Sequence, residues 1–553
     1  MGRVKREASD EPYEDAPRRV RGKARQGGDT STLLRQHKIL ATRVQATPWP
    51  EPGPATTAAP CDADDPTVLP TLKAYATQSH LPQRTQLMDI AWRPPRSEWA
   101  APTTTTPASD VDEPRAAVPL IFHAAGASVP LSPQPYTSVP LRMYMHLTAA
   151  DSTSATHPCH LLDAGGHIYD LAWAPQAEPQ DGEYLLVACS QHREPSARVA
   201  DPSNGDPGQL QGWVWDPSTA QVLCQGRWVC DAGAPLQVAW RPAPPPPGTL
   251  GVAAVSWSDG TVHLLAIPMQ SKGTERLVAE RVLRVPGTSC YSLAWGGDAR
   301  LAVGCTNGTI AVWDLDVSDT PVCVAPVHDT TVSALSWQML PPISVDGEPQ
   351  LEARPHLLFS VGWDGCEHIT DVADMEAPLR HMHSREPRYA TTWLPWSGSW
   401  AVDLGDHQFG TVSLRTHDMG RHHALGFHHA RVLCMAASAL HPFLATGSAE
   451  GSVKLTSVLA MAKRKTAEEG SRFMHKLFRL ARVDDGFVWH QGFYPEGVLP
   501  RAPTRKSGPP VVIDRWDPQV AVTSVAWSPN AGRALLLASG TALGLVHISW
   551  AEG

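Results

Sequence analysis

The sequence predicts an all-β fold, a seven-bladed β-propeller with a disordered basic N-terminal tail. Three observations carry this prediction. A strand-like element that usually ends in tryptophan recurs seven times, a glycine-containing hairpin follows six of the copies, and the first 80 residues are rich in charged residues, proline, alanine and threonine. Recurrence of one short unit is the signature of a repeat architecture, in which each unit buries its apolar faces against its neighbours.

The recurring element has the form apolar-x-apolar-Ala/Ser-Trp. Its copies end at Trp173, Trp240, Trp295, Trp337, Trp393 and Trp527, and VLCMAAS fits the same frame with Ala437 in place of tryptophan. The spacings between copies are 67, 55, 42, 56, 44 and 90 residues. The shorter ones match a WD-type repeat of about 40–45 residues, so the longer ones require insertions in the loops of the blades.

Hairpins follow the tryptophan elements. Their glycines are Gly260, Gly308, Gly365, Gly410, Gly451 and Gly544, and the first copy has a turn expanded by polar residues instead. Trp363-Asp364-Gly365 is the clearest case, because Asp-Gly between two strand-like runs favours a tight turn whose residues adopt positive φ. A strand, a hairpin and an outer strand repeated seven times describe seven four-stranded blades.

Closure of the ring requires a strand from elsewhere. The last copy supplies three strands before Gly553, so an N-terminal segment between residues 115 and 150 is expected to cover the open edge, with 118–124 and 141–147 as candidates. The expected domains are a disordered tail over 1–80, an extension over 81–160 and a propeller over 161–553, with a long insertion at about 459–515. MDIAWRP, at Trp92, is expected to belong to the extension and not to an eighth blade, because no hairpin follows it.

Charge and hydropathy exclude some classes of protein. The net charge is −9, with +4 in residues 1–60 and −13 in the remainder, so the chain is not a globally basic nucleic-acid-binding protein. No apolar run is long enough to span a membrane, and the charged N-terminus lacks the apolar core of a signal peptide. The ten cysteines include no Cys-x-x-Cys pair, which favours reduced thiols in an intracellular protein.

Basic residues cluster in RRVRGKARQ, which holds Arg18, Arg19, Arg21, Lys23 and Arg25. Such a run can lie in the minor groove of DNA, where a narrow groove attracts guanidinium groups. It is equally typical of a nuclear import signal or of a solvated tail, and the sequence leaves the three interpretations open. A second basic cluster, at 463–465, is interpreted as a solvated loop or an import signal.

Histidines suggest structural roles. His328 and His428 each lie nine residues before the end of a repeat element, where a histidine is expected to bond the acidic residue of the blade turn. RHHALGFHHAR gathers His422, His423, His428 and His429, but it has neither paired cysteines nor HExxH spacing, so blade packing or solvation is favoured over zinc.

Catalytic motifs are missing from the sequence. There is no phosphate-binding loop, no dinucleotide fingerprint and no Gly-x-Ser-x-Gly elbow. We therefore predict no catalytic, cofactor-binding or metal residues, no small-molecule substrate and no enzyme activity.

Several segments resemble the WD-repeat subunit of TFIIIC, the general factor of RNA polymerase III. The segments that carry this resemblance are 163–175, 250–268, 327–338, 355–372, 441–457 and 538–550, within a similarity that covers roughly 160–553. The chain departs from the family pattern at Ala437, at Glu450 in place of a turn aspartate, and in the expanded first hairpin.

The resemblance implies a nuclear, non-catalytic scaffold in the half of TFIIIC that binds the B-box promoter element. Its expected partners are the other TFIIIC subunits, especially the large B-box-binding subunit, and its role would be in transcription of transfer RNA and 5S ribosomal RNA genes. Contact with promoter DNA is expected to be weak or indirect, with the basic N-terminal extension assisting. The alternative is a chromatin- or histone-binding propeller that docks peptides, and a propeller hydrolase is a distant third.

Overall fold

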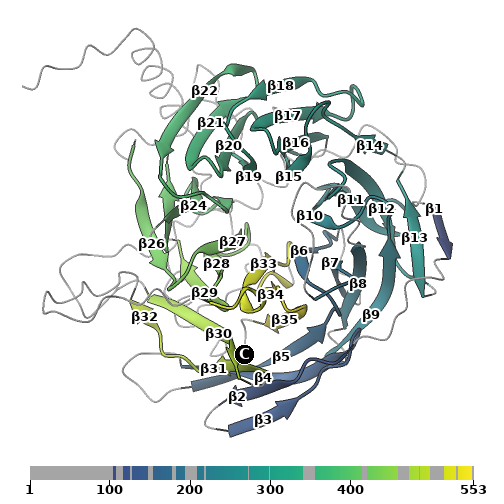
Figure 1. The fold of residues 1–553 in the computed structure, drawn as a ribbon, viewed down its shortest axis with the longest axis vertical. Coiled ribbons are helices and arrows are strands. Elements are labelled where there is room, and N and C mark those ends of the chain that lie inside the picture. The colour runs from purple at the N-terminus through teal and green to yellow at the C-terminus, as the bar shows by residue number, and fades with distance from the viewer. Residues whose placement is uncertain are drawn as a thin grey trace, which may run out of the picture.

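Seven β-sheets are arranged around a common centre in a computed structural model of the chain (Figure 1). The structure describes residues 104–107, 116–124, 127–146, 154–176, 182–193, 208–216, 219–271, 273–279, 281–297, 299–339, 355–405, 407–413, 420–458, 473–484, 486–497, 516–530 and 533–550. The all-β class and the propeller architecture are thereby confirmed. The predicted tail at 1–80, the extension around Trp92 and the basic cluster at 463–465 lie outside the described residues.

Four of the sheets consist of four antiparallel strands, named here from the innermost strand outward. Sheet 2 is β10 (Pro235–Trp240), β11 (Thr249–Trp257), β12 (Val262–Pro268) and β14 (Arg281–Leu283), and sheet 3 is β15 (Cys290–Trp295), β16 (Arg300–Cys305), β17 (Thr309–Asp314) and β18 (Cys323–Pro326). Sheet 4 is β19 (Val332–Trp337), β20 (Leu357–Gly362), β21 (Cys366–Asp371) and β22 (Asp374–His383), and sheet 5 is β23 (Thr391–Leu394), β24 (Ser399–Gly405), β25 (Gln408–Val412) and β26 (His423–Phe427).

The other three sheets carry additional outer strands. Sheet 1 is β6 (Ile168–Trp173), β7 (Glu183–Ser190), β8 (Gly208–Asp216), β9 (Gln221–Val229), β13 (Thr274–Val278) and β1 (Thr104–Pro107). Sheet 6 is β27 (Val432–Ala437), β28 (Phe443–Ser448), β29 (Ser452–Ser457), β30 (Phe473–Val483), β31 (Gly486–Gln491), β2 (Leu120–Ala124) and β3 (Ala127–Leu131), with β32 (Glu496–Gly497) beside β30. Sheet 7 is β33 (Val522–Trp527), β34 (Leu536–Thr541), β35 (Leu545–Trp550), β5 (Ser154–Asp163) and β4 (Ser138–His146), and a 3₁₀ turn, η1 (Pro518–Val520), precedes it.

The seven repeat elements of the sequence are the seven innermost strands: β6, β10, β15, β19, β23, β27 and β33. Each of these strands contacts the next one along the chain, and β33 contacts β6. The prediction that the repeat elements form equivalent strands is therefore confirmed.

The second strand of a sheet is often buried on both faces, because neighbouring sheets pack against each side of it. All nine residues of β11 are buried, and β20 and β28 are buried along their whole length. A continuous apolar run is the sequence pattern of such a strand, whereas a half-exposed strand alternates. This explains why TLGVAAVSW contains no charged residue.

The tryptophans that end the innermost strands link neighbouring sheets. The Nε1 atoms of Trp240, Trp295 and Trp337 donate to the carbonyl oxygens of Ala172, Ala239 and Ala294, at 3.0, 2.9 and 2.9 Å. In each case the acceptor is the residue just before the tryptophan position of the preceding sheet. At these three positions the Trp fills apolar space and makes one hydrogen bond that fixes the position of the adjacent sheet, whereas the Nε1 atoms of Trp393 and Trp527 have no hydrogen-bond partner among the described residues.

The predicted turn glycines are confirmed at five positions. Gly260, Gly308, Gly365, Gly451 and Gly544 have φ of 85°, 87°, 75°, 82° and 94°, in the left-handed region that favours glycine. The prediction that Gly410 lies in a turn was wrong. It lies inside β25, and the residues with positive φ beside this turn are Gly405, which ends β24, and His407, which precedes β25, with φ of 78° and 62°.

The edge of the last sheet is covered by an N-terminal strand, but not by either predicted segment. β5 (Ser154–Asp163) pairs with β35, and Leu545 lies opposite Asp163. The candidate at 141–147 falls largely in β4, one strand further out, and the candidate at 118–124 contains β2, which pairs with β31 of sheet 6. Both predictions for the strand beside β35 were therefore wrong. The edge of β35 is occupied by β5, a segment much closer in sequence to β6.

The segment expected as an insertion at about 459–515 supplies strands where it is described. β30, β31 and β32 lie within it, and β30 is the fourth strand of sheet 6. β31 then extends the sheet outward and pairs in parallel with β2.

Candidate functional sites

His328 forms the hydrogen bonds that the sequence predicted. Its Nδ1 lies 3.1 and 3.0 Å from the two carboxylate oxygens of Asp364, and its Nε2 lies 2.9 Å from Ser360 Oγ. Burial would raise the pKa of Asp364, but the hydrogen bonds from His328 and from the backbone N–H groups of Cys366 and Asp329 hold it below its usual value.

The Asp364–His328–Ser360 arrangement has the order of atoms found in a catalytic triad. A nucleophile must reach a substrate, however, and Ser360 is completely buried in β20. The group instead joins the start of β19 to the turn that links β20 and β21, which is a structural task.

His428 repeats this arrangement with a longer acid. Its Nδ1 lies 3.1 Å from Glu450 Oε1, its Nε2 lies 2.9 Å from Thr446 Oγ1, and Ser452 Oγ donates to Glu450 Oε1 at 2.7 Å. Burial lowers the pKa of His428 to about 4, although the bond to Glu450 opposes this effect. The replacement of the turn aspartate by Glu450 therefore preserves the contact.

The histidines of RHHALGFHHAR do not converge on one point. His428 faces Glu450, His423 and His429 are exposed, and His422 reaches across to sheet 4. The four histidines of this segment therefore do not form a zinc site on their own.

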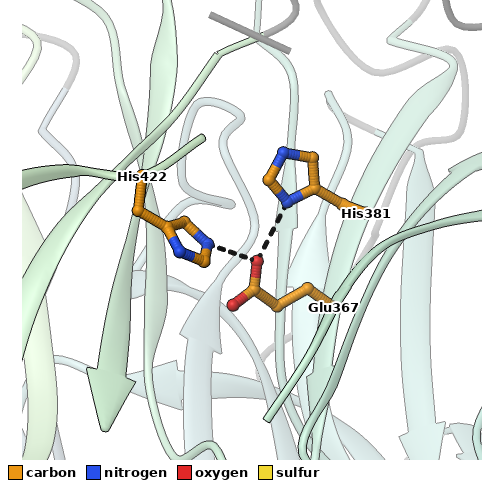
Figure 2. Close-up of side chains that lie close together, drawn as sticks. All are labelled: Glu367, His381 and His422. Atoms are coloured by element: carbon orange, nitrogen blue, oxygen red, sulfur yellow. Dashed lines mark hydrogen bonds and ion pairs between the residues drawn. The ribbon is translucent and has the colours of Figure 1, made fainter. Parts of the chain in front are cut away.

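His422 instead belongs to a group centred on Glu367 (Figure 2). Glu367 Oε2 accepts from His381 Nδ1 at 3.1 Å and from His422 Nε2 at 2.8 Å. Glu367 is on β21 and His381 on β22, whereas His422 lies directly before β26, the outermost strand of sheet 5. The three side chains therefore join two neighbouring sheets.

Arg388 holds the second oxygen of the same carboxylate. Its NH2 atom lies 3.1 Å from Glu367 Oε1, and its NH1 atom donates to the carbonyl oxygen of Asp403 at 2.6 Å. Burial alone would raise the pKa of Glu367, but the hydrogen bonds from His381 and His422 lower it to about 2. Glu367 is therefore a buried carboxylate that stays ionised.

Sequence reasoning missed this group. Glu367 and His381 are 14 residues apart on paired strands, and His422 is 55 residues from Glu367 in the next sheet. The available signal was the strand Cys366–Asp371, which places Glu367 and His368 beside the apolar strand Leu357–Gly362.

Asp170 is a second buried acid that the sequence analysis did not single out. Its Oδ1 accepts from Ser524 Oγ at 2.7 Å and its Oδ2 accepts from the backbone N–H of Val238 at 2.9 Å. Asp170 is on β6, so its carboxylate connects sheets 7, 1 and 2. Burial raises the pKa of Asp170 to about 6, against the effect of these hydrogen bonds.

The predicted DNA-contacting residues Arg18, Arg19, Arg21, Lys23 and Arg25 lie outside the described residues, and their role stays a prediction. Along the ranges that the structure describes, no helix has the length and apolar character needed to cross a membrane.

Comparison with known proteins identifies the repeat. Residues 421–457, which include β26 to β29, match the family model described as WD domain, G-beta repeat. The chain is also similar to a protein named Transcription factor tau subunit sfc6 from Schizosaccharomyces pombe (strain 972 / ATCC 24843), with 25% identity over 405 residues. The chain therefore contains a WD repeat, and over much of its length it is similar to a protein named as a subunit of transcription factor tau.

The alignment with the tau subunit covers 70% of this chain and 64% of the relative. The match therefore extends far beyond the single WD repeat at 421–457, so the likeness is not limited to the generic repeat.

Proposed function

We propose that this protein is a non-catalytic scaffold subunit of a TFIIIC-type factor. In this role it would support B-box promoter binding and RNA polymerase III transcription of transfer RNA and 5S ribosomal RNA genes. The observation that carries the proposal is the alignment with the tau subunit over 70% of the chain.

A scaffold role agrees with the architecture. The buried polar groups centred on Asp170, Glu367 and Glu450 and the tryptophan bonds between sheets all connect parts of the propeller to one another. Such connections favour a rigid body with surfaces of fixed geometry. We further propose that the seven sheets act as seven blades of one closed ring and that residues 81–160 serve as an extension of it, as their strands on the outer edges suggest.

The absence of catalysis is also part of the proposal. The group that most resembles a catalytic triad has its serine completely buried. The similarity to a protein named as a transcription factor subunit also supports a non-catalytic role.

The partners we propose are the other subunits of the factor, especially the large subunit that binds the B-box, and the compartment is the nucleus. We propose weak or indirect contact with promoter DNA, assisted by the basic cluster at Arg18–Arg25. The uneven charge supports a DNA contact through the tail and not through the propeller, since residues 1–60 carry +4 and the remainder −13.

Reconstitution tests the proposal. The large B-box-binding subunit is expressed alone and together with this chain, and binding to a B-box duplex is compared with binding to a duplex of scrambled sequence. We expect a stable complex of the two proteins with higher affinity or preference for the B-box than either protein shows alone. A chain that forms no complex with the large subunit and leaves its DNA binding unchanged would contradict the proposal.

A further inference from the structure

We propose that Glu367, His381 and His422 bind a divalent zinc ion that clips sheet 4 to sheet 5. The site is independent of the proposed role in transcription. It is built from one carboxylate and two imidazoles, the donor set that zinc takes in sites with three protein ligands.

The donor atoms are already close together. Glu367 Oε2 lies 3.1 Å from His381 Nδ1 and 2.8 Å from His422 Nε2, and all three atoms lie within 4.8 Å of one another. Tetrahedral zinc with bonds of about 2.1 Å places its ligand atoms about 3.3–3.5 Å apart. An ion placed between Glu367 Oε2 and the two ring nitrogens joined to it in Figure 2 would therefore replace the two hydrogen bonds after small shifts of the side chains.

Burial prepares the ligands for this role. The side chains of Glu367 and His381 are 0% and 1% exposed, so their positions are fixed by packing on β21 and β22. The side chain of His422 is 15% exposed, so the group has one side that reaches solvent. Solvent on that side provides an entry path for the ion and a water molecule for the fourth coordination position.

Arg388 provides the outer support that metal-binding carboxylates usually have. It pairs with Glu367 Oε1 and is itself held by the carbonyl oxygen of Asp403, which leaves Oε2 as the atom that faces the imidazoles. The positive charge of Arg388 reduces the affinity for a cation. The two imidazole ligands favour zinc over calcium or magnesium, which prefer oxygen ligands.

Because of its location between two sheets, a bound zinc ion would stabilise the fold. Sheets 4 and 5 are joined in sequence by the link from β22 to β23, and the zinc clip would join their outer strands as well. Zinc binding to the folded chain should therefore raise its resistance to heat.

The test uses the full chain without a histidine tag, stripped with a chelator and then titrated with zinc. We expect one zinc ion per chain, a rise in melting temperature with zinc, and a visible absorption band of tetrahedral Co²⁺ when cobalt replaces zinc. His422→Gln should lower zinc affinity by at least about 100-fold, because loss of outer-shell partners alone costs 10–100-fold.

The matched control is His429→Gln, an exposed histidine seven residues further along, which should bind zinc as the unmodified chain does. Glu367→Gln provides a second ligand variant, and tryptophan emission reports whether each variant is folded. Failure of the unmodified chain to bind stoichiometric zinc would overturn the proposal. So would unchanged zinc affinity in a folded His422→Gln chain.

Discussion

Trp173 donates its Nε1 hydrogen to the carbonyl oxygen of Ala526 at 3.1 Å, across 353 residues of sequence. The bond joins β6, the first of the innermost strands, to β33, the last of them. It follows the same rule as the bonds from Trp240, Trp295 and Trp337 to their preceding sheets. One residue of the repeat motif thus connects neighbouring sheets and also closes the ring.

The first prediction concerns this closing bond. Trp173→Phe keeps an aromatic ring but removes the N–H donor, so the carbonyl of Ala526 loses its partner. Trp527→Phe is the matched control, because the Nε1 atom of Trp527 has no hydrogen-bond partner among the described residues. Chemical denaturation should show that Trp173→Phe lowers the free energy of unfolding by about 1 kcal/mol more than Trp527→Phe does. Equal losses would mean that the bond contributes nothing.

A second prediction concerns the turn at Gly365. Its φ is 75°, and a Cβ atom there would collide with the backbone carbonyl oxygen of Ser384. Gly248 has a similar φ of 78°, but a Cβ atom added there meets nothing within 4 Å. Gly248→Ala should lower the free energy of unfolding by about 1–2 kcal/mol through backbone strain alone. Gly365→Ala should lower it by clearly more, because the added Cβ atom also collides with the backbone. Thermal or chemical denaturation of the two variants measures the difference, and a smaller loss at Gly365 would contradict the geometry of the turn.

The third prediction concerns acid sensitivity. His441 is buried, its Nδ1 accepts from the N–H of Phe443 at 3.2 Å, and its Nε2 donates to the carbonyl oxygen of Ala534 at 3.0 Å. Acceptance at Nδ1 requires the neutral imidazole with its proton on Nε2, and burial lowers the pKa of His441 to about 3 from 6.5. As the pH falls below about 6.5, the unfolded chain takes up the proton first, so the folded state loses stability until about pH 3.

His441→Gln removes this titration. The variant should be less stable than the unmodified chain at pH 7.5, and the difference in free energy of unfolding should shrink by up to about 2 kcal/mol between pH 6.5 and 5. Denaturant titrations at each pH measure it. His429→Gln, at an exposed position, serves as the control for the substitution itself. A difference for His441→Gln that does not change with pH would show that this histidine is not held neutral.

A fourth prediction concerns DNA. Replacement of Arg18, Arg19, Arg21, Lys23 and Arg25 by Ala should weaken binding to all duplexes alike and flatten the dependence on salt. Each phosphate contact that is lost lowers the slope of log K against log salt by about 0.9. A chain without residues 1–60 gives a sharper comparison. If it binds a B-box duplex as tightly and as specifically as the full chain, the propeller itself contacts DNA.

The sequence was most informative where the repeat is local. The seven innermost strands and five of the six turn glycines follow directly from short motifs, since strand alternation and turn chemistry are decided by adjacent residues. The His328–Asp364 and His428–Glu450 pairs could also be predicted, because each lies within one repeat unit.

Features that depend on the arrangement of sheets could not be predicted in this way. The choice of β5 over the two candidate segments depends on which strand reaches the edge of β35, and Gly410 was mistaken for a turn because the preceding Gly405 ends β24. The Trp173–Ala526 bond joins the first sheet to the last, and the bond from His422 to Glu367 joins two neighbouring sheets. No motif spans those distances in sequence.

The proposed membership of a TFIIIC-type factor can be tested on the native complex. The most direct measurement is purification of the tagged full chain from nuclear extract, followed by quantitative mass spectrometry of the proteins that remain bound, with an unrelated WD-repeat propeller as control. If the proposal holds, the other subunits of the factor, including its large B-box-binding subunit, are recovered in near-equal amounts with the chain and are missing from the control. Recovery of histones and chromatin enzymes without those subunits would contradict it and would favour a histone-binding propeller.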